Sequence, residues 1–171
     1  MPVLVVKECI CCGLTKPLSE FHNREGSHAI SYCKICSTFF WVGRQAMAEL
    51  GLYDFSVRRP SRQALKVKLK QMEEVLGINP IRFQERLAEL DGKCPICQNI
   101  VDKLYADHNH TTGKFRDFIC NTCNTAIGLL HEDMFAVLAV ATYLAKDQKR
   151  ENEVQQIRTL RRTIRVARKV G

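Results

Sequence analysis

The sequence contains no hydrophobic run long enough to cross a bilayer. Its longest apolar stretch, from Met134 to Ala145, falls short of the roughly 20 residues that a membrane-spanning helix needs. The N-terminus also lacks the basic start and the cleavage site of a secretory signal peptide. A composition of 46% hydrophobic and 26% charged residues excludes both a disordered tail and a membrane bundle. We therefore expect a cytoplasmic protein with no membrane partner, whose clustered cysteines bind metal instead of forming disulfides.

Acidic residues are too few to balance the basic ones, since 18 Asp and Glu stand against 26 Lys and Arg and leave a net charge of +8. The excess is uneven: residues 58–93 and 149–171 carry +4 and +6, whereas residues 1–57 are neutral and residues 94–148 carry −2. Basic segments around a mildly acidic, metal-binding centre are typical of a protein that binds nucleic acid. Because eight zinc-bound thiolates would lower the net charge to about +4, local clusters matter more than the total.

Two basic clusters are candidate contacts with DNA phosphates. Solvated helix faces, a frayed tail or binding to an anionic membrane surface would produce similar patterns. Neither cluster carries base-reading information, which favours structure-selective or nonspecific binding over sequence readout. The first cluster comprises Arg58, Arg59, Arg62, Lys66, Lys68 and Lys70, and the second comprises Arg158, Arg161, Arg162, Arg165, Arg168 and Lys169.

Eight of the nine cysteines form four C-x2-C pairs. Two thiolates separated by two residues form a knuckle that offers both sulfurs to one tetrahedral ion, and a second knuckle completes a zinc ribbon. Cys11 is left as a spare thiol, and we interpret His22 and His28 as exposed loop residues instead of competing ligands. The sequence thus predicts two structural zinc sites, one at Cys9, Cys12, Cys33 and Cys36 and the other at Cys94, Cys97, Cys120 and Cys123.

Apolar periodicity and capping signals predict the helices and the division of the chain. We expect helices at about 37–50 and 61–76, ended by Gly51 and Gly77, and a third helix that starts at Asn79-Pro80. An apolar helix at 133–146 is expected to be buried in a core or a dimer interface. The predicted division is a zinc ribbon plus helix at 1–57, a basic helical linker at 58–79, the domain of the second zinc site at 80–148, and a basic C-terminal helix or tail at 149–171.

A polar run, Asp107-His108-Asn109-His110, lies between the knuckles of the second zinc site. Two short strands and a Gly-containing turn predict a hairpin over 105–119, and a helix is expected to begin at Asn124. Neighbouring residues of a regular strand point to opposite faces. Asp107 and His108 can therefore serve one site only if the strand is irregular, and we expect a break or bulge at 107–110.

The same run suits hydrolytic chemistry at a metal. Asp107 offers a carboxylate and Asn124 an amide oxygen, and these few ligands suit Mg²⁺ because it keeps water and accepts phosphate oxygens from a substrate. His108 could then act as general base toward an attacking water. Two alternatives stay open at this point: the run is a polar loop, or its histidines bind a further zinc ion.

At these residues the chain resembles the phage recombination endonuclease VII family of His-Me finger (ββα-metal, HNH-like) nucleases. The front module, Cys9 to Cys36, is similar to a zinc ribbon found before this domain in phage and phage-like proteins. The resemblance implies an α+β, mainly helical fold: a zinc-bound ββα-metal nuclease core at 80–148, an N-terminal zinc ribbon and flanking helices. It covers about residues 80–130 and rests on Gly92-Lys93-Cys94-Pro95-Ile96-Cys97, Asp107-His108-Asn109-His110, Gly113-Lys114-Phe115-Arg116-Asp117-Phe118 and Cys120-Asn121-Thr122-Cys123-Asn124.

The resemblance also implies an activity and its residues. It implies a DNA endonuclease that depends on Mg²⁺, with Mn²⁺ as an alternative, and that resolves branched DNA such as Holliday junctions as a homodimer. Asp107 and Asn124 would bind the catalytic metal, and His108 would be the general base. His110 would assist by holding the scissile phosphate, and the cysteines of the second site would hold structural zinc. A phage-encoded member would act in the cytoplasm of its bacterial host.

Two other functions are weighed against this one. The first is an HNH nicking or homing endonuclease that cuts duplex DNA as a monomer. The second is a noncatalytic zinc-ribbon protein that binds nucleic acid, such as a phage transcription regulator. A mere binder has no need of a carboxylate, an imidazole and an amide beside zinc, whereas this chain has all three at Asp107, His108 and Asn124. Catalysis is therefore the favoured hypothesis.

Overall fold

The protein is described from a computed structural model that covers residues 5–22, 32–53, 62–146, 155–160 and 162. The chain divides into two compact units, Met1–Asn121 and Thr122–Gly171, and each is described by itself. The linker expected at Tyr53 to Pro60 lies almost wholly outside the described residues. So do several side chains of the predicted set, namely His28, Arg58, Arg59, Arg161, Arg165, Arg168 and Lys169.

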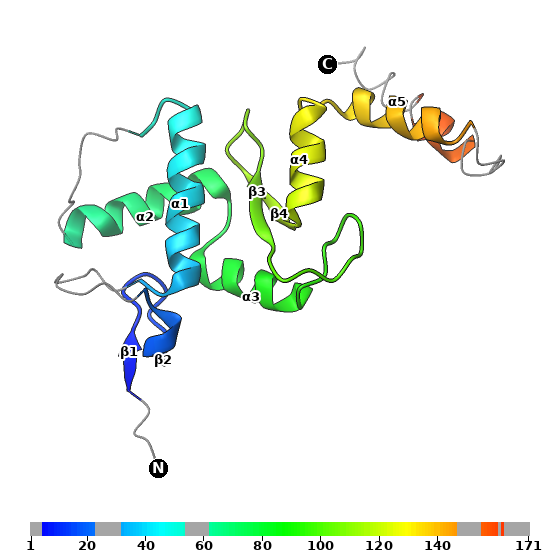
Figure 1. The fold of residues 1–171 in the computed structure, drawn as a ribbon. Helices are drawn as coiled ribbons and strands as arrows, with labels where there is room; N and C mark the ends of the chain where they lie inside the picture. The colour runs from blue at the N-terminus through cyan, green and yellow to red at the C-terminus, as the bar shows by residue number, and fades with distance from the viewer. Residues whose placement is uncertain (1–4, 23–31, 54–61, 147–154, 161, 163–171) are drawn as a thin grey trace. The chain divides into compact units, whose positions relative to one another are not determined.

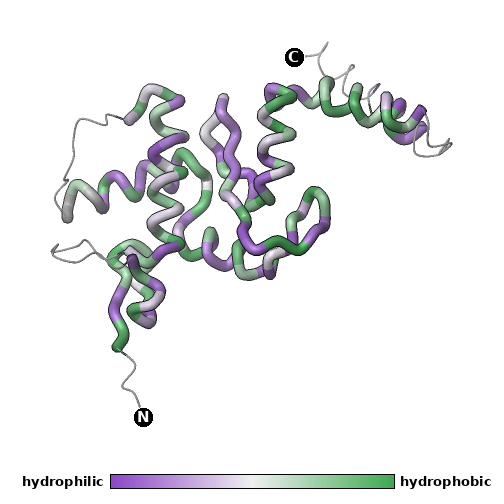
Figure 2. Tube along the Cα trace, viewed as in Figure 1, coloured by the Kyte–Doolittle hydropathy of each residue, from purple (hydrophilic) through white to green (hydrophobic). Residues whose placement is uncertain are grey.

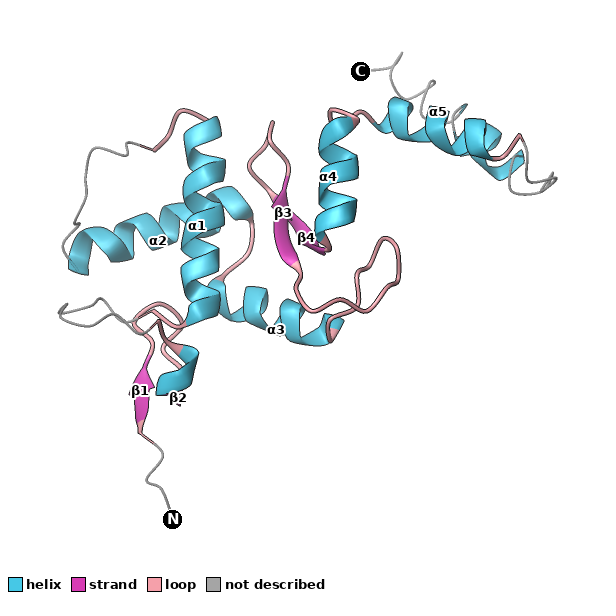
Figure 3. Cartoon of the chain, viewed as in Figure 1, coloured by secondary structure: helices cyan, strands magenta, loops and turns pink. Residues whose placement is uncertain are grey.

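The first unit begins with a small hairpin of β1 (Val6–Glu8) and β2 (Thr15–Pro17), which pair antiparallel. A short 3-10 helix, η1 (Leu18–Glu20), follows, and Phe21 then forms a single bridge with Cys33. This bridge brings the two cysteine-bearing segments of the front module together. Figure 3 shows strand β1 of this hairpin in magenta.

That helix, α1 (Lys34–Glu49), buries one face at spacings of three and four residues. It begins three residues before the predicted start at 37, because Cys33 is its N-cap and the second cysteine knuckle forms its first turn. It ends as predicted, since Gly51 adopts a left-handed conformation with φ 69°. Gly43 is the crossing point with the next helix: a Cβ atom there would lie 2.7 Å from Met72 Cγ.

The next helices are α2 (Arg62–Leu76) and α3 (Pro80–Leu90), and α2 crosses α1 (Figure 1). The predicted stop signal at Gly77 is present, with φ 69°. The predicted start of α3 is also confirmed: the Asn79 side chain accepts hydrogen bonds from the N–H groups of Ile81 at 3.0 Å and Arg82 at 2.9 Å. Capping thus determines both ends of the α2–α3 connection.

A second hairpin closes the first unit. Its strands, β3 (Tyr105–His108) and β4 (Phe115–Ile119), pair antiparallel within the predicted range. Phe83 of α3 is fully buried and packs edge-on against Phe39 at 5.3 Å and Phe118 at 4.5 Å between ring centroids. This aromatic cluster joins α1, α3 and β4 into one core. The mixed α+β fold expected from the sequence is therefore confirmed.

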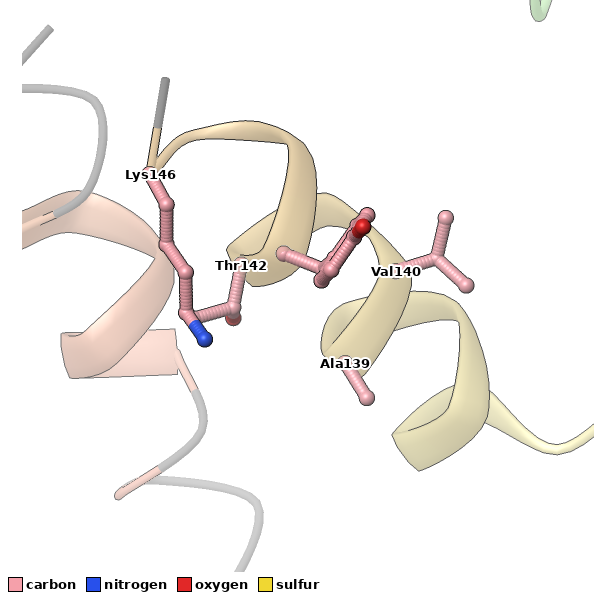
Figure 4. A pocket seen from close by; sticks show the side chains of 5 residues that line it. Ala139, Val140, Thr142 and Lys146 are labelled. Atoms are coloured by element: carbon pink, nitrogen blue, oxygen red, sulfur yellow. The ribbon is translucent and has the colours of Figure 1, made fainter. Parts of the chain in front are cut away.

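The second unit contains most of α4 (Asn121–Leu129) and all of α5 (Met134–Leu144). Helix α4 begins three residues before the predicted Asn124, because Cys123 lies in its first turn. The expectation that the 133–146 helix is buried in a core is wrong for the chain by itself, since α5 contains no buried residue. Figure 2 shows hydrophobic residues along α5. An open depression of about 480 Å³ on this helix is lined by Ala139, Val140, Thr142, Tyr143 and Lys146, whose side chains Figure 4 draws.

Taken singly, none of the described helices is long and apolar enough to cross a bilayer. Only α4 and α5 together meet the limits of length and composition, and a bend of 105° separates them.

Candidate active site and zinc centres

Each predicted zinc site begins with one C-x2-C knuckle, and these two knuckles have the same pattern of backbone hydrogen bonds. In the first, Gly13 N donates to Cys9 O at 2.8 Å and Cys9 N donates to Leu14 O at 2.9 Å. In the second, Gln98 N donates to Cys94 O and Cys94 N donates to Asn99 O, both at 2.9 Å. Each turn closes on a residue with positive φ, Gly13 at 72° and Gln98 at 64°. The repeated C-x2-C spacing thus builds the same local structure twice.

The second knuckle of each site is built on a helix start. Cys33 N donates to Cys9 Sγ at 3.3 Å, and Cys120 N donates to Cys94 Sγ at 3.4 Å. Such N–H donors stabilise a thiolate, the form of cysteine that binds metal. Burial by itself raises the pKa of the Cys94 thiol, but backbone hydrogen bonds from Cys120 and Cys97 outweigh it and lower the pKa to about 6. The same balance lowers the pKa of Cys9 to about 7.

Both predicted sets of four sulfurs are brought together. The ligand atoms of each set lie within 4.8 Å of one another, as four thiolates around one tetrahedral zinc ion require. Cys11 belongs to neither set among the described residues, and His22 is exposed as predicted. The sites comprise Cys9, Cys12, Cys33 and Cys36, and Cys94, Cys97, Cys120 and Cys123; the boundary between the two units falls inside the last knuckle.

Gln84 of α3 supports the first zinc site and was not predicted from the sequence. It is 9% exposed, and its Nε2 donates to Cys36 Sγ at 3.7 Å and to Pro80 O at 3.1 Å. Its Oε1 accepts a hydrogen bond from Lys16 Nζ of β2. One buried amide thus connects α3, a zinc-ligating sulfur and the front hairpin.

The hairpin register shifts between Asp107 and His108, within the predicted irregular stretch 107–110, and the extra residue lies in the partner strand β4. Asp107 pairs with Asp117, but the next residue, His108, pairs with Phe115, so Arg116 is an extra residue in β4. In a regular strand one of two neighbours would face outward, whereas Asp107 is 7% and His108 8% exposed. Asp107 and His108 are therefore both shielded from solvent next to the bulge, where Asp107 contacts Arg116 and His108 contacts Glu49.

The bulged residue also engages the carboxylate. Arg116 Nε donates to Asp107 Oδ2 at 2.6 Å, and a terminal guanidinium nitrogen of Arg116 donates to Asp107 Oδ1 at 3.2 Å and to His108 O at 3.0 Å. Arg116 therefore neutralises Asp107 and fixes the bulge. The sequence contained this residue within a recognised motif, but nothing in the pattern assigned it a partner.

The two histidines share a carboxylate that comes from α1. His108 Nε2 lies 2.8 Å from Glu49 Oε2, and His110 Nδ1 lies 3.3 Å from Glu49 Oε1. The imidazole rings stack with centroids 4.8 Å apart and planes 12° from parallel. The structure thus brings His108 and His110 together. It adds Glu49, which no local motif could reveal because it is 59 residues away from His108.

Asn124, the other predicted cation ligand, lies in α4 directly after Cys123 and is exposed. It belongs to the second unit, whereas Asp107 and His108 belong to the first. Its role as a partner of Asp107 stays a prediction. Within the first unit Asp107, alone of the two predicted ligands, offers this site a carboxylate, the ligand type that a hard cation accepts, and its oxygens also accept hydrogen bonds from Arg116.

A zinc-clamped hairpin followed by a helix defines the order of elements in a ββα-metal domain. Residues 70–146 match the model of the recombination endonuclease VII family, which confirms the resemblance over this segment. Among solved structures, the ββα-Me type II restriction endonuclease Hpy99I is similar at 23% identity, with 82% of this chain and 65% of that chain covered and a TM-score of 0.31. No curated protein matches the chain.

Proposed function

We propose that the protein is a metal-dependent DNA endonuclease that hydrolyses phosphodiester bonds at branched DNA, in the cytoplasm. The observation that supports this most is the pair formed by Asp107 and His108. These neighbours are both buried at a β-bulge, between the knuckles of a four-cysteine site and inside the endonuclease VII match. A hairpin with a purely structural role has no need to bury two adjacent ionisable residues.

The roles of the residues follow from their chemistry. Asp107 and Asn124 would hold the divalent cation, which we take to be Mg²⁺ or Mn²⁺. When bound, this ion neutralises charge on the phosphate and stabilises the leaving 3′ oxygen. His108 accepts a proton from water as the water oxygen bonds to phosphorus and the bond to the 3′ oxygen breaks. His110, stacked on His108 and 59% exposed in its side chain, is placed to contact the scissile phosphate.

DNA is the proposed partner, bound through basic side chains outside the hairpin. Within the described part of the C-terminal segment, residues 155–160 and 162 are helical, and both Arg158 and Arg162 are exposed. A junction has two strands to cut, so a homodimer with two sites suits this substrate. The exposed apolar residues of α5 supply a candidate dimer contact, because a helix without buried residues is costly to leave in water.

The deciding experiment compares DNA substrates. Purified full-length protein is incubated with Mg²⁺ on a four-way junction and on a linear duplex of matched sequence. We expect paired cuts near the branch point and little cutting of the duplex. Single nicks in the duplex would instead indicate a nickase, and binding to both substrates without cleavage would indicate a noncatalytic protein.

Substitution of the base tests the mechanism. His108→Ala should bind the junction with near wild-type affinity while its cleavage falls by at least about 100-fold, since a general base contributes 10²- to 10⁴-fold. His22→Ala, which changes an exposed histidine of the front module, is the matched control and should cleave normally. Cleavage by His108→Ala at a rate comparable to wild type would refute the assigned base.

A further inference from the structure

We infer that Glu49 is the positioning residue of His108: its carboxylate holds the imidazole in the tautomer that leaves Nδ1 free to accept a proton. This inference rests on the proposed function, because it concerns the same site. It extends the site beyond the endonuclease VII match at 70–146, since Glu49 is the last residue of α1 and lies in the front part of the chain.

The geometry is that of one carboxylate shared by two imidazoles. Each oxygen of Glu49 faces one ring nitrogen, at 2.8 Å for His108 and 3.3 Å for His110. The His108 side chain is 10% exposed and that of Glu49 is 29% exposed. A partly buried contact of this length is less screened than an ion pair on the open surface.

Packing of the β3–β4 turn fixes the position of the hairpin relative to α1. The turn between β3 and β4 lies against the ends of α1 and α2: a Cβ atom on Gly113 would lie 3.0 Å from Leu50 Cδ1 and 2.7 Å from Val75 Cγ1 (Figure 1). Lys114 Nζ also donates to the Glu74 carbonyl at 2.9 Å. The turn therefore holds the histidines against the end of α1. Packing of the backbone elements, and not side-chain conformation alone, fixes their contact with Glu49.

The chemical consequence follows from the properties of imidazole. A neutral imidazole carries its proton on one nitrogen and a lone pair on the other. Because the Glu49 carboxylate can only accept a hydrogen bond, it selects the His108 form with the proton on Nε2. Nδ1 then carries the lone pair that takes the proton from water, and the carboxylate stabilises the imidazolium that results. Glu49 acts through His108 and touches no substrate atom.

The same three side chains could instead hold a metal ion, since their ligand atoms lie within 4.8 Å of one another. The close approach of His108 Nε2 to Glu49 Oε2 at 2.8 Å favours a direct hydrogen bond. Neighbouring ligand atoms on one tetrahedral ion would stand about 3.3 Å apart. The zinc content distinguishes the hydrogen bond from a metal site. If Glu49 positions His108, wild-type protein and Glu49→Ala both contain two zinc ions per chain. A third ion in wild type that is lost in Glu49→Ala would overturn the inference.

The kinetic test uses the full-length protein and a junction substrate. Glu49→Ala should lower kcat by about 10- to 100-fold, as loss of an orienting partner typically does, with KM for DNA changed less than twofold. Glu49→Gln retains an oxygen acceptor and should recover part of this loss. Glu85→Ala, which removes an exposed glutamate of α3, is the matched control and should leave both constants unchanged. A wild-type kcat for Glu49→Ala would overturn the inference.

A spectroscopic measurement keeps the test valid if Glu49→Ala folds poorly. In wild-type protein, ¹⁵N–¹H correlation spectra of the imidazole should show His108 protonated on Nε2, and Glu49→Gln should retain this tautomer. A wild-type His108 protonated on Nδ1 would overturn the inference. Failure of the proposed function looks different: wild-type protein would leave all DNA intact even though its His108 tautomer is the one expected.

Discussion

Arg116 binds the Asp107 carboxylate through two hydrogen bonds, one to each oxygen, at 2.6 and 3.2 Å. Both oxygens of the carboxylate that we propose as a cation ligand therefore accept hydrogen bonds from one guanidinium. A divalent cation and Arg116 must either compete for Asp107 or divide its lone pairs between them. The two cases differ in how strongly the enzyme depends on the concentration of the cation.

Competition predicts that Arg116→Ala lowers the Mg²⁺ concentration needed for half-maximal cleavage. A hydrogen bond to a charged group contributes about 1.5 kcal/mol, and solvent screens this partly exposed side chain, so we expect a reduction of up to about tenfold. The measurement is a titration of junction cleavage with Mg²⁺. Arg82→Ala on α3 removes an arginine that is likewise paired with carboxylates and serves as the control. An unchanged Mg²⁺ requirement in Arg116→Ala would mean that Arg116 and the cation share the carboxylate.

Zinc at the second four-cysteine site should contribute directly to folding. Cys94→Ser removes the thiol that accepts the Cys120 N–H, and we expect zinc to fall from two ions to one per chain. The cooperative melting transition should move to lower temperature, and the soluble yield should fall. Thr122→Ser, an exposed position without a ligand role inside the last knuckle, is the matched control. If Cys94→Ser kept both ions and the wild-type melting curve, the ligand assignment would be wrong.

The Gln84 amide should tune the first zinc site without being a ligand. Gln84→Leu keeps most of the buried volume but removes the donor to Cys36 Sγ. Loss of such a partner typically costs 10- to 100-fold in metal affinity, so we expect about that loss at one of the two zinc ions. Competition with a chromophoric chelator measures it, and Gln71→Leu, at an exposed position of α2, is the control. Equal zinc retention by wild type and Gln84→Leu would show that the contact is incidental.

Much of this structure could be predicted from local sequence patterns. The C-x2-C spacing predicted both sets of ligands, and Asn79-Pro80 predicted the start of α3. The bulge at Asp107 and His108 was predicted from a functional requirement, since both side chains could serve one site only in an irregular strand. The starts of α1 and α4 were placed three residues late, because a knuckle that doubles as a helical turn carries no separate helix signal.

Contacts between residues that are far apart in the sequence could not be predicted from local patterns. Glu49 looked like an ordinary polar residue at a helix end, and only the packing of the hairpin turn on α1 and α2 brings it to His108. Gln84 is separated from Cys36 by 48 residues and likewise carries no motif. The division 1–57, 58–79, 80–148 and 149–171 stays a prediction, and so does the pairing of Asn124 with Asp107.

The last prediction concerns the anchor between α3 and the hairpin. Arg86 Nε donates to Asp117 Oδ1 at 2.9 Å and a terminal guanidinium nitrogen donates to Asp117 Oδ2 at 2.6 Å, while Asp117 stands opposite Asp107 in the sheet. The hydrogen bond and charge of Asp117 raise the pKa of the Arg86 guanidinium, which keeps its positive charge at neutral pH.

Because this pair is bidentate and partly buried, Asp117→Ala should lower the free energy of unfolding by about 1 kcal/mol. Chemical denaturation measures the change, and a cycle with Arg86→Ala isolates the part that belongs to the pair. Additive effects of the two substitutions would show that the residues do not stabilise each other. Cleavage should fall as well, because a hairpin less firmly attached to α3 holds the bulge at Asp107 less rigidly. A variant with lowered stability but an unchanged kcat would show that the Arg86–Asp117 pair stabilises the fold without affecting catalysis.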